Sequence, residues 1–135
     1  MKLSSKERCA LCLMADIAAY GGEKCVSLKD VSARQDISVK YLEQIVPHLL
    51  RAGLLKSARG AKGGYALVKP VERYTAGEIL HAAAAKVAPA QNTVDAFAST
   101  LLAAAYAYAN SVPLRDMFSP PVEEKRRSQA AYLLD

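Results

Sequence analysis

The sequence predicts a mainly α-helical fold that contains one small β-hairpin, and three features of the 135 residues support this class. Helical segments, each opened by a serine, fill residues 4–52. Two short strand-like runs around a glycine-rich turn follow them. A long, almost uncharged helical segment then occupies residues 93–110. Because 52% of the residues are hydrophobic and 23% are charged, close to the globular average, the chain can bury one real core.

The first helix begins at the capping-box pattern Ser4-x-x-Glu7, whose side chains bond the free N–H groups of the first turn. An apolar run continues to Tyr20, and Gly21-Gly22 ends the helix. Residues at helical spacing are expected to face the core: Leu3, Ala10, Leu11, Met14, Ile17 and Ala18.

Two further helices follow in helix-turn-helix order. Ser27 caps a short helix that runs to about Gln35, with Leu28 and Val31 pointing inward. After a tight turn at Asp36-Ile37, Ser38 caps a third helix that runs to about Ala52 and is closed by Gly53. Pro47 is expected to bend this helix without ending it. Its predicted buried face is Val39, Leu42, Ile45, Val46, Leu49 and Leu50, and its outer face is Lys40, Tyr41, Glu43, Gln44, His48 and Arg51.

Residues 54–58 and 65–68 read as two short strands joined by the basic turn Arg59-Gly60-Ala61-Lys62-Gly63-Gly64. Three helices followed by a two-stranded wing are the plan of a winged helix-turn-helix. Pro70 ends this unit, and the capping box Thr75-x-x-Glu78 starts another helix through about Ala85.

The next helix is nearly apolar on all sides. Asn92 or Thr93 can cap it, and no charged residue occurs between Asp95 and Arg115. A helix of this kind must be buried, and a position between two subunits is the preferred interpretation. A membrane span is the rival, but the segment is rich in alanine and breaks at Pro113. Its apolar stripe, the predicted dimerisation surface, is Val94, Phe97, Leu101, Ala104/Ala105 and Tyr108.

The chain therefore divides into a winged helix-turn-helix over residues 1–74, connecting and dimerisation helices over 75–118, and a tail over 119–135. The tail holds a charged run and an amphiphilic end, which form either a short helix or a flexible segment. No basic and apolar leader precedes the first helix, so a cytoplasmic location is expected.

The net charge of +5 is unevenly distributed. Residues 1–70 carry 12 Lys or Arg against 6 Asp or Glu, whereas residues 71–135 carry 6 against 7. A polyanion partner is therefore expected for the first half. A helix with a polar face followed by a cationic loop can read a base-pair edge and bind the phosphates beside it.

These motifs resemble the Rrf2 family of bacterial winged-helix transcription regulators over about residues 1–118. The matching pieces are Met1-x-Leu3-Ser4, Ser38-x-x-Tyr41-Leu42-Glu43-Gln44, Ala52-Gly53-Leu54, Ser57-x-Arg59-Gly60-x-x-Gly63-Gly64-Tyr65, Gly77-Glu78-Ile79 and Leu114. The resemblance implies a homodimer whose long apolar helices pack together. It also implies a third helix in the major groove and a wing along the minor groove and backbone. The DNA contacts that it implies are Ser38, Lys40, Tyr41, Glu43, Gln44, Arg59 and Gly60.

Three charged residues, Glu43, Arg59 and Lys62, are each expected to contact a different part of the DNA. Glu43 can accept a hydrogen bond from a cytosine amino group, although an exposed glutamate is often only solvated. Arg59, beside a glycine at a hairpin tip, can enter a narrow minor groove. Lys62 suits a phosphate contact, and a merely solvated lysine is the equal alternative. The glycine-rich turn is not a nucleotide-binding loop, because it lacks the Gly-Lys-Ser/Thr ending and a following helix.

The sequence departs from the sensor members of the family in one respect. Those members carry three cysteines in the loop before the dimerisation helix, and these hold an iron–sulfur cluster. Here that loop, residues 86–93, has no cysteine, and Arg8 stands where some sensors place an acidic ligand. No cofactor is therefore expected.

Three cysteines lie elsewhere: Cys9 and Cys12 in the first helix, and Cys25 just beyond it. They are interpreted first as small apolar core residues. A thiol switch or a replacement metal site is the alternative, although no second Cys or His pair completes a zinc site. His48 and His81 are isolated and are expected at the surface.

The sequence thus predicts a homodimeric, sequence-specific DNA-binding regulator, a repressor without an iron–sulfur cluster. Its operator is a roughly palindromic duplex with half-sites about one helical turn (~34 Å) apart, or a multiple of that. Two alternatives stay open: a thiol- or metal-responsive regulator that uses Cys9, Cys12 or Cys25, and an interaction module with only generic DNA affinity that recruits an enzyme or another regulator through its apolar helix and tail. Besides duplex DNA and a second copy, an unidentified effector or protein is an open partner. No nucleophile–base pair or metal constellation indicates an enzyme.

Overall fold

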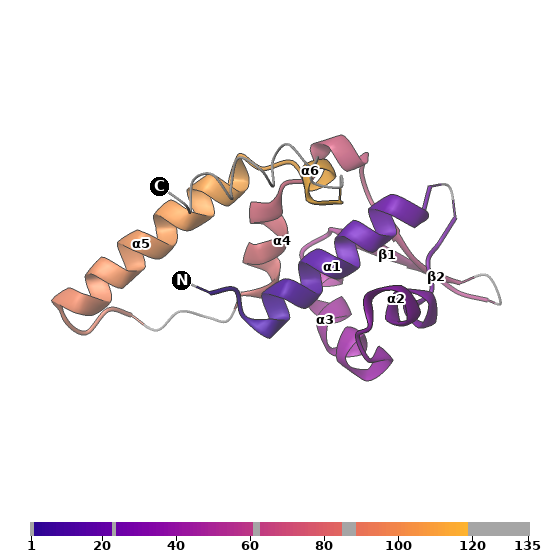
Figure 1. Ribbon diagram of the computed structural model, residues 1–135, viewed down its shortest axis with the longest axis horizontal. Helices are drawn as coiled ribbons and strands as arrows, with labels where there is room; N and C mark the ends of the chain where they lie inside the picture. The colour runs from indigo at the N-terminus through magenta and orange to yellow at the C-terminus, as the bar shows by residue number, and fades with distance from the viewer. Residues whose placement is uncertain (1, 23, 61–62, 85–88, 119–135) are drawn as a thin grey trace, which may run out of the picture.

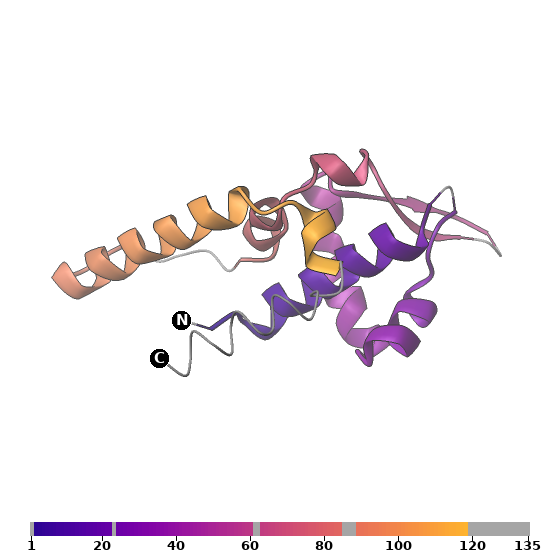
Figure 2. The same cartoon turned by 45° about the horizontal axis from the view of Figure 1, so that its top comes forward.

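The computed structural model describes residues 2–22, 24–60, 63–84 and 89–118, and Figure 1 shows their arrangement. The elements in chain order are α1 (Ser5–Tyr20), α2 (Leu28–Gln35), α3 (Val39–Arg51), β1 (Leu55–Ala58), β2 (Gly64–Leu67), the 3-10 helix η1 (Val71–Arg73), α4 (Ala76–Ala83), α5 (Thr93–Asn110) and α6 (Leu114–Phe118). The mainly helical fold with one hairpin is therefore confirmed. The hairpin and α5 lie at opposite ends of the molecule (Figures 1 and 2).

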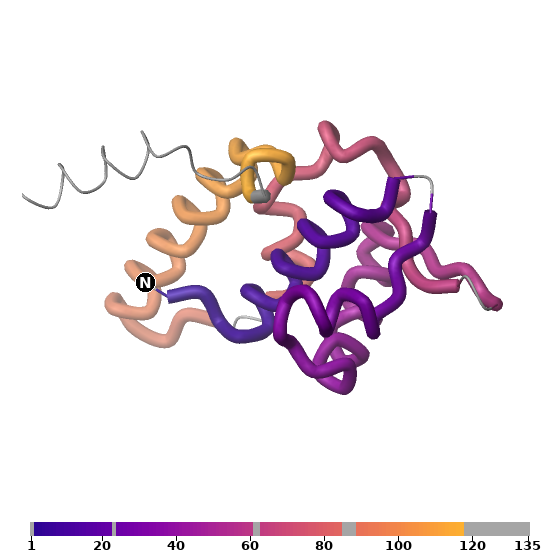
Figure 3. The backbone as a smooth tube through the Cα atoms, turned by 45° about the vertical axis from the view of Figure 1, so that its right-hand side comes forward, coloured from indigo at the N-terminus to yellow at the C-terminus, as the bar shows by residue number. Residues whose placement is uncertain are grey.

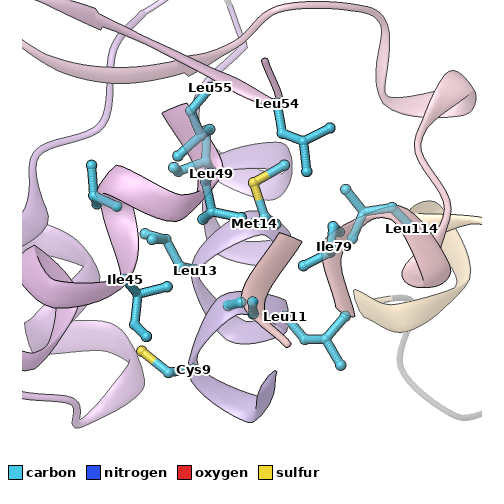
Figure 4. Packing of buried hydrophobic residues seen from close by; sticks show 14 of the residues in the cluster. Cys9, Leu11, Leu13, Met14, Ile45, Leu49, Leu54, Leu55, Ile79 and Leu114 are labelled. Carbon is cyan, nitrogen blue, oxygen red and sulfur yellow. The ribbon is translucent and has the colours of Figure 1, made fainter. Parts of the chain in front are cut away.

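The core surrounds α1, which packs against α2, α3, α4 and α6. Leu13, Met14 and Ile17 of α1 are almost fully buried, and Figure 4 shows Leu13 and Met14 among side chains from α3, α4 and α6. Burying one such side chain contributes roughly 1.5–3 kcal/mol relative to leaving it in water. The other completely buried aliphatic side chains of the described residues are Ala10, Val31, Leu42, Ile45, Leu49, Ile79 and Leu114.

The predicted helix caps are confirmed. The side chains of Ser4, Ser27, Ser38, Thr75 and Asn92 each accept a hydrogen bond from a backbone N–H in the first turn of the helix that follows. Both capping boxes are complete, because the carboxylates of Glu7 and Glu78 accept the backbone N–H of the cap residue. Local sequence therefore decides where these helices begin.

The predicted end of α3 is confirmed, and the predicted end of α4 is corrected. The helix α3 continues through Pro47 to Arg51, and Gly53 follows it at φ +73°, a conformation that glycine adopts without strain. The helix α4 ends at Ala83, two residues earlier than predicted, because Ala84 is already extended.

Two of the predicted core residues are exposed instead. Leu3 is 40% exposed because it precedes α1, and Leu50 is 36% exposed at the last turn of α3. Tyr41 and His48, predicted to lie on the outer face, are half-buried, and Tyr41 packs against the core. The helical period thus assigns the central positions of each face correctly and fails at its margins.

The hairpin pairs β1 and β2 antiparallel, with Leu55 opposite Leu67 and Ala58 opposite Gly64. The strand β1 begins one residue later than predicted, and β2 begins one residue earlier than predicted. Val26 pairs with β2 through an isolated β-bridge that was not predicted. It exchanges two backbone hydrogen bonds with Tyr65, at N–O distances of 2.8 and 2.9 Å.

The helix α5 has the predicted cap and length, and within the single chain most of its predicted apolar stripe is exposed. Val94 is 73% exposed, Phe97 67%, Leu101 49% and Tyr108 73%. No helix in the described ranges is long and apolar enough to cross a membrane. A short helix that was not predicted, α6, follows α5, which ends at Asn110, and begins at the fully buried Leu114.

Candidate nucleic-acid interface

The α2–turn–α3 unit places the predicted DNA-reading helix at one edge of the molecule (Figure 1). Asp36 makes the turn in the left-handed conformation at φ +54°, which an aspartate tolerates better than most residues. Val31 and Leu42 are fully buried where α2 and α3 meet the core. The outer face of α3 is therefore fixed by apolar packing behind it.

A buried carboxylate joins α1 to α2. Asp16 is 1% exposed, and its oxygens accept hydrogen bonds from Arg34 at 2.7 and 3.0 Å and from Gln35 at 2.9 Å. The Arg34 guanidinium also lies 4.1 Å from the ring centre of Tyr20. The hydrogen bond with Asp16 is the main cause that raises the pKa of Arg34. Sequence reasoning missed this network, because nothing in the chain marks residues 18 positions apart as partners.

The predicted contact residues of α3 share one exposed region. Lys40, Glu43 and Gln44 are exposed, whereas Tyr41 is half-buried against the core and offers only part of its ring. The Ser38 hydroxyl accepts a hydrogen bond from the N–H of Tyr41 at 3.1 Å, which leaves its own hydrogen free to donate. The start of α3 also presents the positive end of the helix dipole, a favourable place for a phosphate.

The tip of the wing presents Arg59 and Gly60. Both are exposed, and Gly60 has φ +109°, which requires glycine. The N–H of Gly63 donates to the carbonyl of Gly60 at 2.8 Å and closes the turn. Lys62, the third predicted wing contact, lies outside the described residues. At the base of the wing, Gly64 has φ +153°, and a Cβ there would collide with the Val26 carbonyl.

Tyr74 anchors the base of the wing from the core. Its ring is completely buried, and its hydroxyl donates to the carbonyl of Leu54 at 2.8 Å. The same oxygen accepts from the N–H of Val68 at 2.9 Å, so one side chain joins the start of β1 to the end of β2. The Lys69 ammonium lies 4.7 Å from the ring centre and 2.7 Å from a Glu78 oxygen. Sequence reasoning did not find Tyr74 either, although a tyrosine after a wing is a visible signal.

The cysteines differ in their surroundings. Cys9 is buried, and Figure 4 shows its sulfur beside Ile45. Burial, and next the neighbouring Cys12, raises the pKa of the Cys9 thiol to about 11. Cys12 and Cys25 are half-buried. Within the described ranges, no group of three His, Cys, Asp or Glu side chains is placed to hold a metal ion. Of the two histidines, His81 is exposed as predicted.

This arrangement defines a winged helix-turn-helix protein, and comparison with known proteins identifies its family. The sequence profile of the Rrf2 family, described as an iron-dependent transcriptional regulator, matches residues 3–111. The chain therefore belongs to the Rrf2 family. This membership places it among transcriptional regulators and not among enzymes, as the sequence predicts.

Individual relatives agree with the family. Protein rrf2 of Nitratidesulfovibrio vulgaris is 41% identical over 91 residues, which cover 67% of this chain and 61% of that protein. The regulator IscR of Cereibacter sphaeroides is 48% identical over 84 residues, which cover 61% of this chain and 54% of that protein. The regulator CymR of Bacillus subtilis is 41% identical over 91 residues, which cover 67% of this chain and 66% of that protein. The matched part thus spans between half and two thirds of these relatives.

Solved structures give the same result over more of the chain. The structure of CymR, the global cysteine regulator of B. subtilis, has a TM-score of 0.70 at 32% identity and covers 87% of this chain and 95% of its own. The structure of T. potens IscR has a TM-score of 0.75 at 31% identity, and the match covers 93% of this chain and 91% of the IscR chain. The winged-helix fold is therefore shared with these regulators.

Proposed function

We propose that this protein is a cytoplasmic, homodimeric regulator that binds operator DNA sequence-specifically and represses transcription without an iron–sulfur cluster. In this proposal residues 1–74 form the DNA-binding unit, residues 75–118 connect and dimerise, and 119–135 form a tail. The observation that carries the proposal is the exposed polar face of α3 beside an exposed cationic wing tip, in the basic half of the chain. Such a pairing suits simultaneous contact with base edges and phosphates.

Each exposed side chain has a distinct role in this proposal. Glu43 reads a cytosine amino group, and Gln44 supports readout with an amide that both donates and accepts. Lys40, Ser38 and the exposed part of Tyr41 bind the backbone, together with Gly60 and Lys62. Arg59 enters the minor groove, where the negative potential is enhanced. These roles agree with the exposure of the side chains that the structure describes.

Two observations support the absence of a cluster. Residues 86–93 contain no cysteine. Cys9, the most deeply buried thiol, has a raised pKa, whereas a cluster or zinc ligand must be a thiolate. The proposal therefore assigns no iron–sulfur sensing to this chain, although its family is described as iron-dependent.

A thiol-responsive form of the same function remains a second candidate, and the position of Cys25 favours it. Cys25 is half-buried and directly precedes Val26, which pairs with Tyr65 at the base of the wing. A modified Cys25 would therefore disturb the wing without touching DNA. Cys9 is removed from this candidate because it is buried and because that burial raises the pKa of its thiol to about 11, which disfavours the reactive thiolate.

Selection of bound duplexes from a random pool, with and without reductant, tests the proposal. We expect a roughly palindromic sequence with half-sites about one helical turn, ~34 Å, or a multiple of it apart. Recovery of unrelated sequences held only by salt-sensitive affinity would contradict specific regulation and favour the interaction-module alternative. A sequence recovered only with reductant would support the thiol-responsive form, and a Cys25→Ser variant should then lose that dependence.

A further inference from the structure

The helix α5 carries three different faces. The side chains that face the body of the molecule are half-buried or buried: Leu102, Ala105, Tyr106 and Ala109. One flank of the helix is apolar and exposed, and it includes two of the three aromatic residues of α5: Val94, Phe97, Leu101 and Tyr108. The other flank, which is also exposed, carries only small or polar side chains: Ala96, Ser99, Ala103, Ala107 and Asn110. Only the first flank is therefore suited to an apolar partner.

A cavity of about 310 Å³ lies beside that apolar flank. Figure 3 shows the start of α1 running alongside α5, and the cavity lies between these helices, α4 and the residues that lead into α6. Its walls are mainly apolar and include Leu11, Leu80, Leu102, Ala105 and Tyr106. Tyr108 lines the cavity and also belongs to the apolar flank, so the two surfaces are continuous.

The carboxylate that lines the cavity is already engaged. Glu7 lies at its margin, but an oxygen of Glu7 accepts the N–H of Ser4 in the capping box of α1. Burial, and next the Glu7 carboxylate, raises the pKa of Tyr106, so this phenol stays neutral. The cavity therefore favours an uncharged, apolar occupant over an anion.

We propose that the occupant is a second copy of this chain, and that the partner's α5 inserts Phe97 into this cavity. The inference rests on the proposed homodimer and names the contact that makes it. Leu101 lies at the middle of the apolar flank, seven residues from both Val94 and Tyr108. A two-fold axis at Leu101 that pairs the α5 helices antiparallel sets Val94 of one chain opposite Tyr108 of the other.

The same axis sets Phe97, one turn before Leu101, opposite the partner subunit's Ala105, one turn after it. Ala105 is small and forms part of the cavity wall, so a large side chain meets a small one over an open space. The face is self-complementary, as a two-fold interface requires. No charged residue between Asp95 and Arg115 opposes the pairing.

The surface involved is large enough for a dimer. Covering the four flank side chains on both chains removes roughly 1,000 Å² from water, given ~150–250 Å² for each aromatic side chain. The cavity walls bring the contact toward the ~1,200–2,000 Å² of stable interfaces. Because Leu11 belongs to α1 and Leu80 to α4, the partner's Phe97 would rest on the core that also supports α3. The contact would therefore fix the distance between the two DNA-reading helices.

The sequence contains no tryptophan, so one introduced indole reports its own surroundings. We expect the emission of the full-length F97W variant to shift to shorter wavelength as sedimentation shows dimer formation. It should return to the solvent value on dilution to monomer. The matched control S99W places the indole on the small and polar flank of the same helix. Its emission should stay at the solvent value at every concentration.

Each other outcome overturns the inference in a distinguishable way. A dimer in which F97W emits as if in water would refute the Phe97 contact and leave the homodimer standing. A monomer with short-wavelength emission would show that another part of the same chain, such as residues 119–135, fills the cavity. A monomer with solvent-like emission at all concentrations would refute both this contact and the homodimer. Specific DNA binding is measured separately, so failure of this contact and failure of the proposed DNA-binding function can be told apart.

A compensating pair tests the same contact by sedimentation. F97A should raise the dimer dissociation constant roughly 30-fold or more, as expected for loss of a central aromatic anchor. A105W should weaken the dimer similarly, because the indole would fill the cavity that the partner's Phe97 needs. The double variant F97A/A105W should recover much of the lost affinity. Additive losses in the double variant would contradict the inference.

Discussion

The carboxylate of Asp16 in α1 holds the guanidinium of Arg34 in α2 through two hydrogen bonds of 2.7 and 3.0 Å. The Asp16 side chain has no exposed surface, whereas that of Arg34 is 31% exposed. Because α2 packs on α3, this ion pair helps to set the angle at which α3 faces its partner. Asp16 therefore influences the proposed DNA-reading surface indirectly, through Arg34 and the packing of α2 on α3.

Replacing Asp16 by asparagine should lower both stability and specific DNA affinity. The variant keeps the shape of the side chain but leaves Arg34 without its charged partner, and breaking a buried ion pair is strongly destabilising. We expect the urea midpoint to fall by roughly 1 M, given the ordinary dependence of unfolding on urea. The control D30N removes an exposed carboxylate from α2. Equal midpoints for the two variants would show that the Asp16 network is not structural.

Removing the hydroxyl of Tyr74 should loosen the wing. The variant Y74F leaves the carbonyl of Leu54 and the N–H of Val68 without their buried partner, at a cost of about 1–3 kcal/mol. Urea unfolding measures the loss, and faster hydrogen exchange at Val68 would locate it. The control Y20F removes the hydroxyl of an exposed tyrosine. Equal stability of Y74F and Y20F would show that the Tyr74 hydroxyl does not hold the wing.

Gly77 marks the closest approach of α4 to the end of α5. A Cβ at this position would collide with the side chain of Asn110 and lie 2.7 Å from its backbone nitrogen. We expect G77A to lower stability by about 1–3 kcal/mol through overpacking, in spite of the better helix propensity of alanine. The double variant G77A/N110A should recover only part of the loss, because the backbone contact remains. A stabilised G77A would contradict this close packing.

The buried thiol of Cys9 should resist alkylation. At pH 8 we expect iodoacetamide to modify Cys12 and Cys25 before Cys9, because Cys9 is buried and its pKa is raised to about 11. Mass spectrometry of the native protein measures the order, and in urea all three should react at similar rates. Rapid native labelling of Cys9 would return it to the candidate redox residues.

The same thiol predicts a pH dependence of stability. Its pKa is 9.0 unperturbed and about 11 in the fold, so the unfolded chain loses this proton first as the pH rises. The stabilising contribution is complete below pH 9 and is lost as the pH rises toward 11. The difference in unfolding free energy between wild type and C9A should therefore shrink over this window. A constant difference would mean that Cys9 ionises normally.

Local signals in the sequence predict most of the fold. Helix starts depend on a cap residue and its neighbour three positions on, and the centres of the buried faces follow the helical period, as at Leu42 and Ile45. Contacts between distant residues leave no such pattern. Asp16 with Arg34, and Tyr74 with Leu54, become visible only when the fold brings them together. The bridge at Val26 could not be predicted, because a single paired residue has no periodicity.

The candidate site divides in the same way. Its exposed members Lys40, Glu43, Gln44 and Arg59 were identifiable from motif and charge. The half-buried position of Tyr41 depends on packing against the core, which the helical period does not resolve. The exposure of α5 also follows from tertiary structure: the sequence predicts an apolar helix, whereas only the fold shows which flank the same chain leaves uncovered.

The central claim is that α3 and the wing bind DNA in different ways, and the affinities of two variants for a selected operator test it most directly. Anisotropy titrations would compare R59A and E43A with the charge-matched controls R73A and E72A, which alter exposed residues of η1. Operator, base-substituted and unrelated duplexes would be measured at several salt concentrations.

We expect R59A to weaken binding to all three duplexes and to lower the salt slope by about 1. E43A should keep general affinity and lose about 1–3 kcal/mol of discrimination between operator and substituted duplex. If R59A and E43A bind every duplex as R73A and E72A do, at matched salt, then α3 and the wing are not the DNA-binding surface.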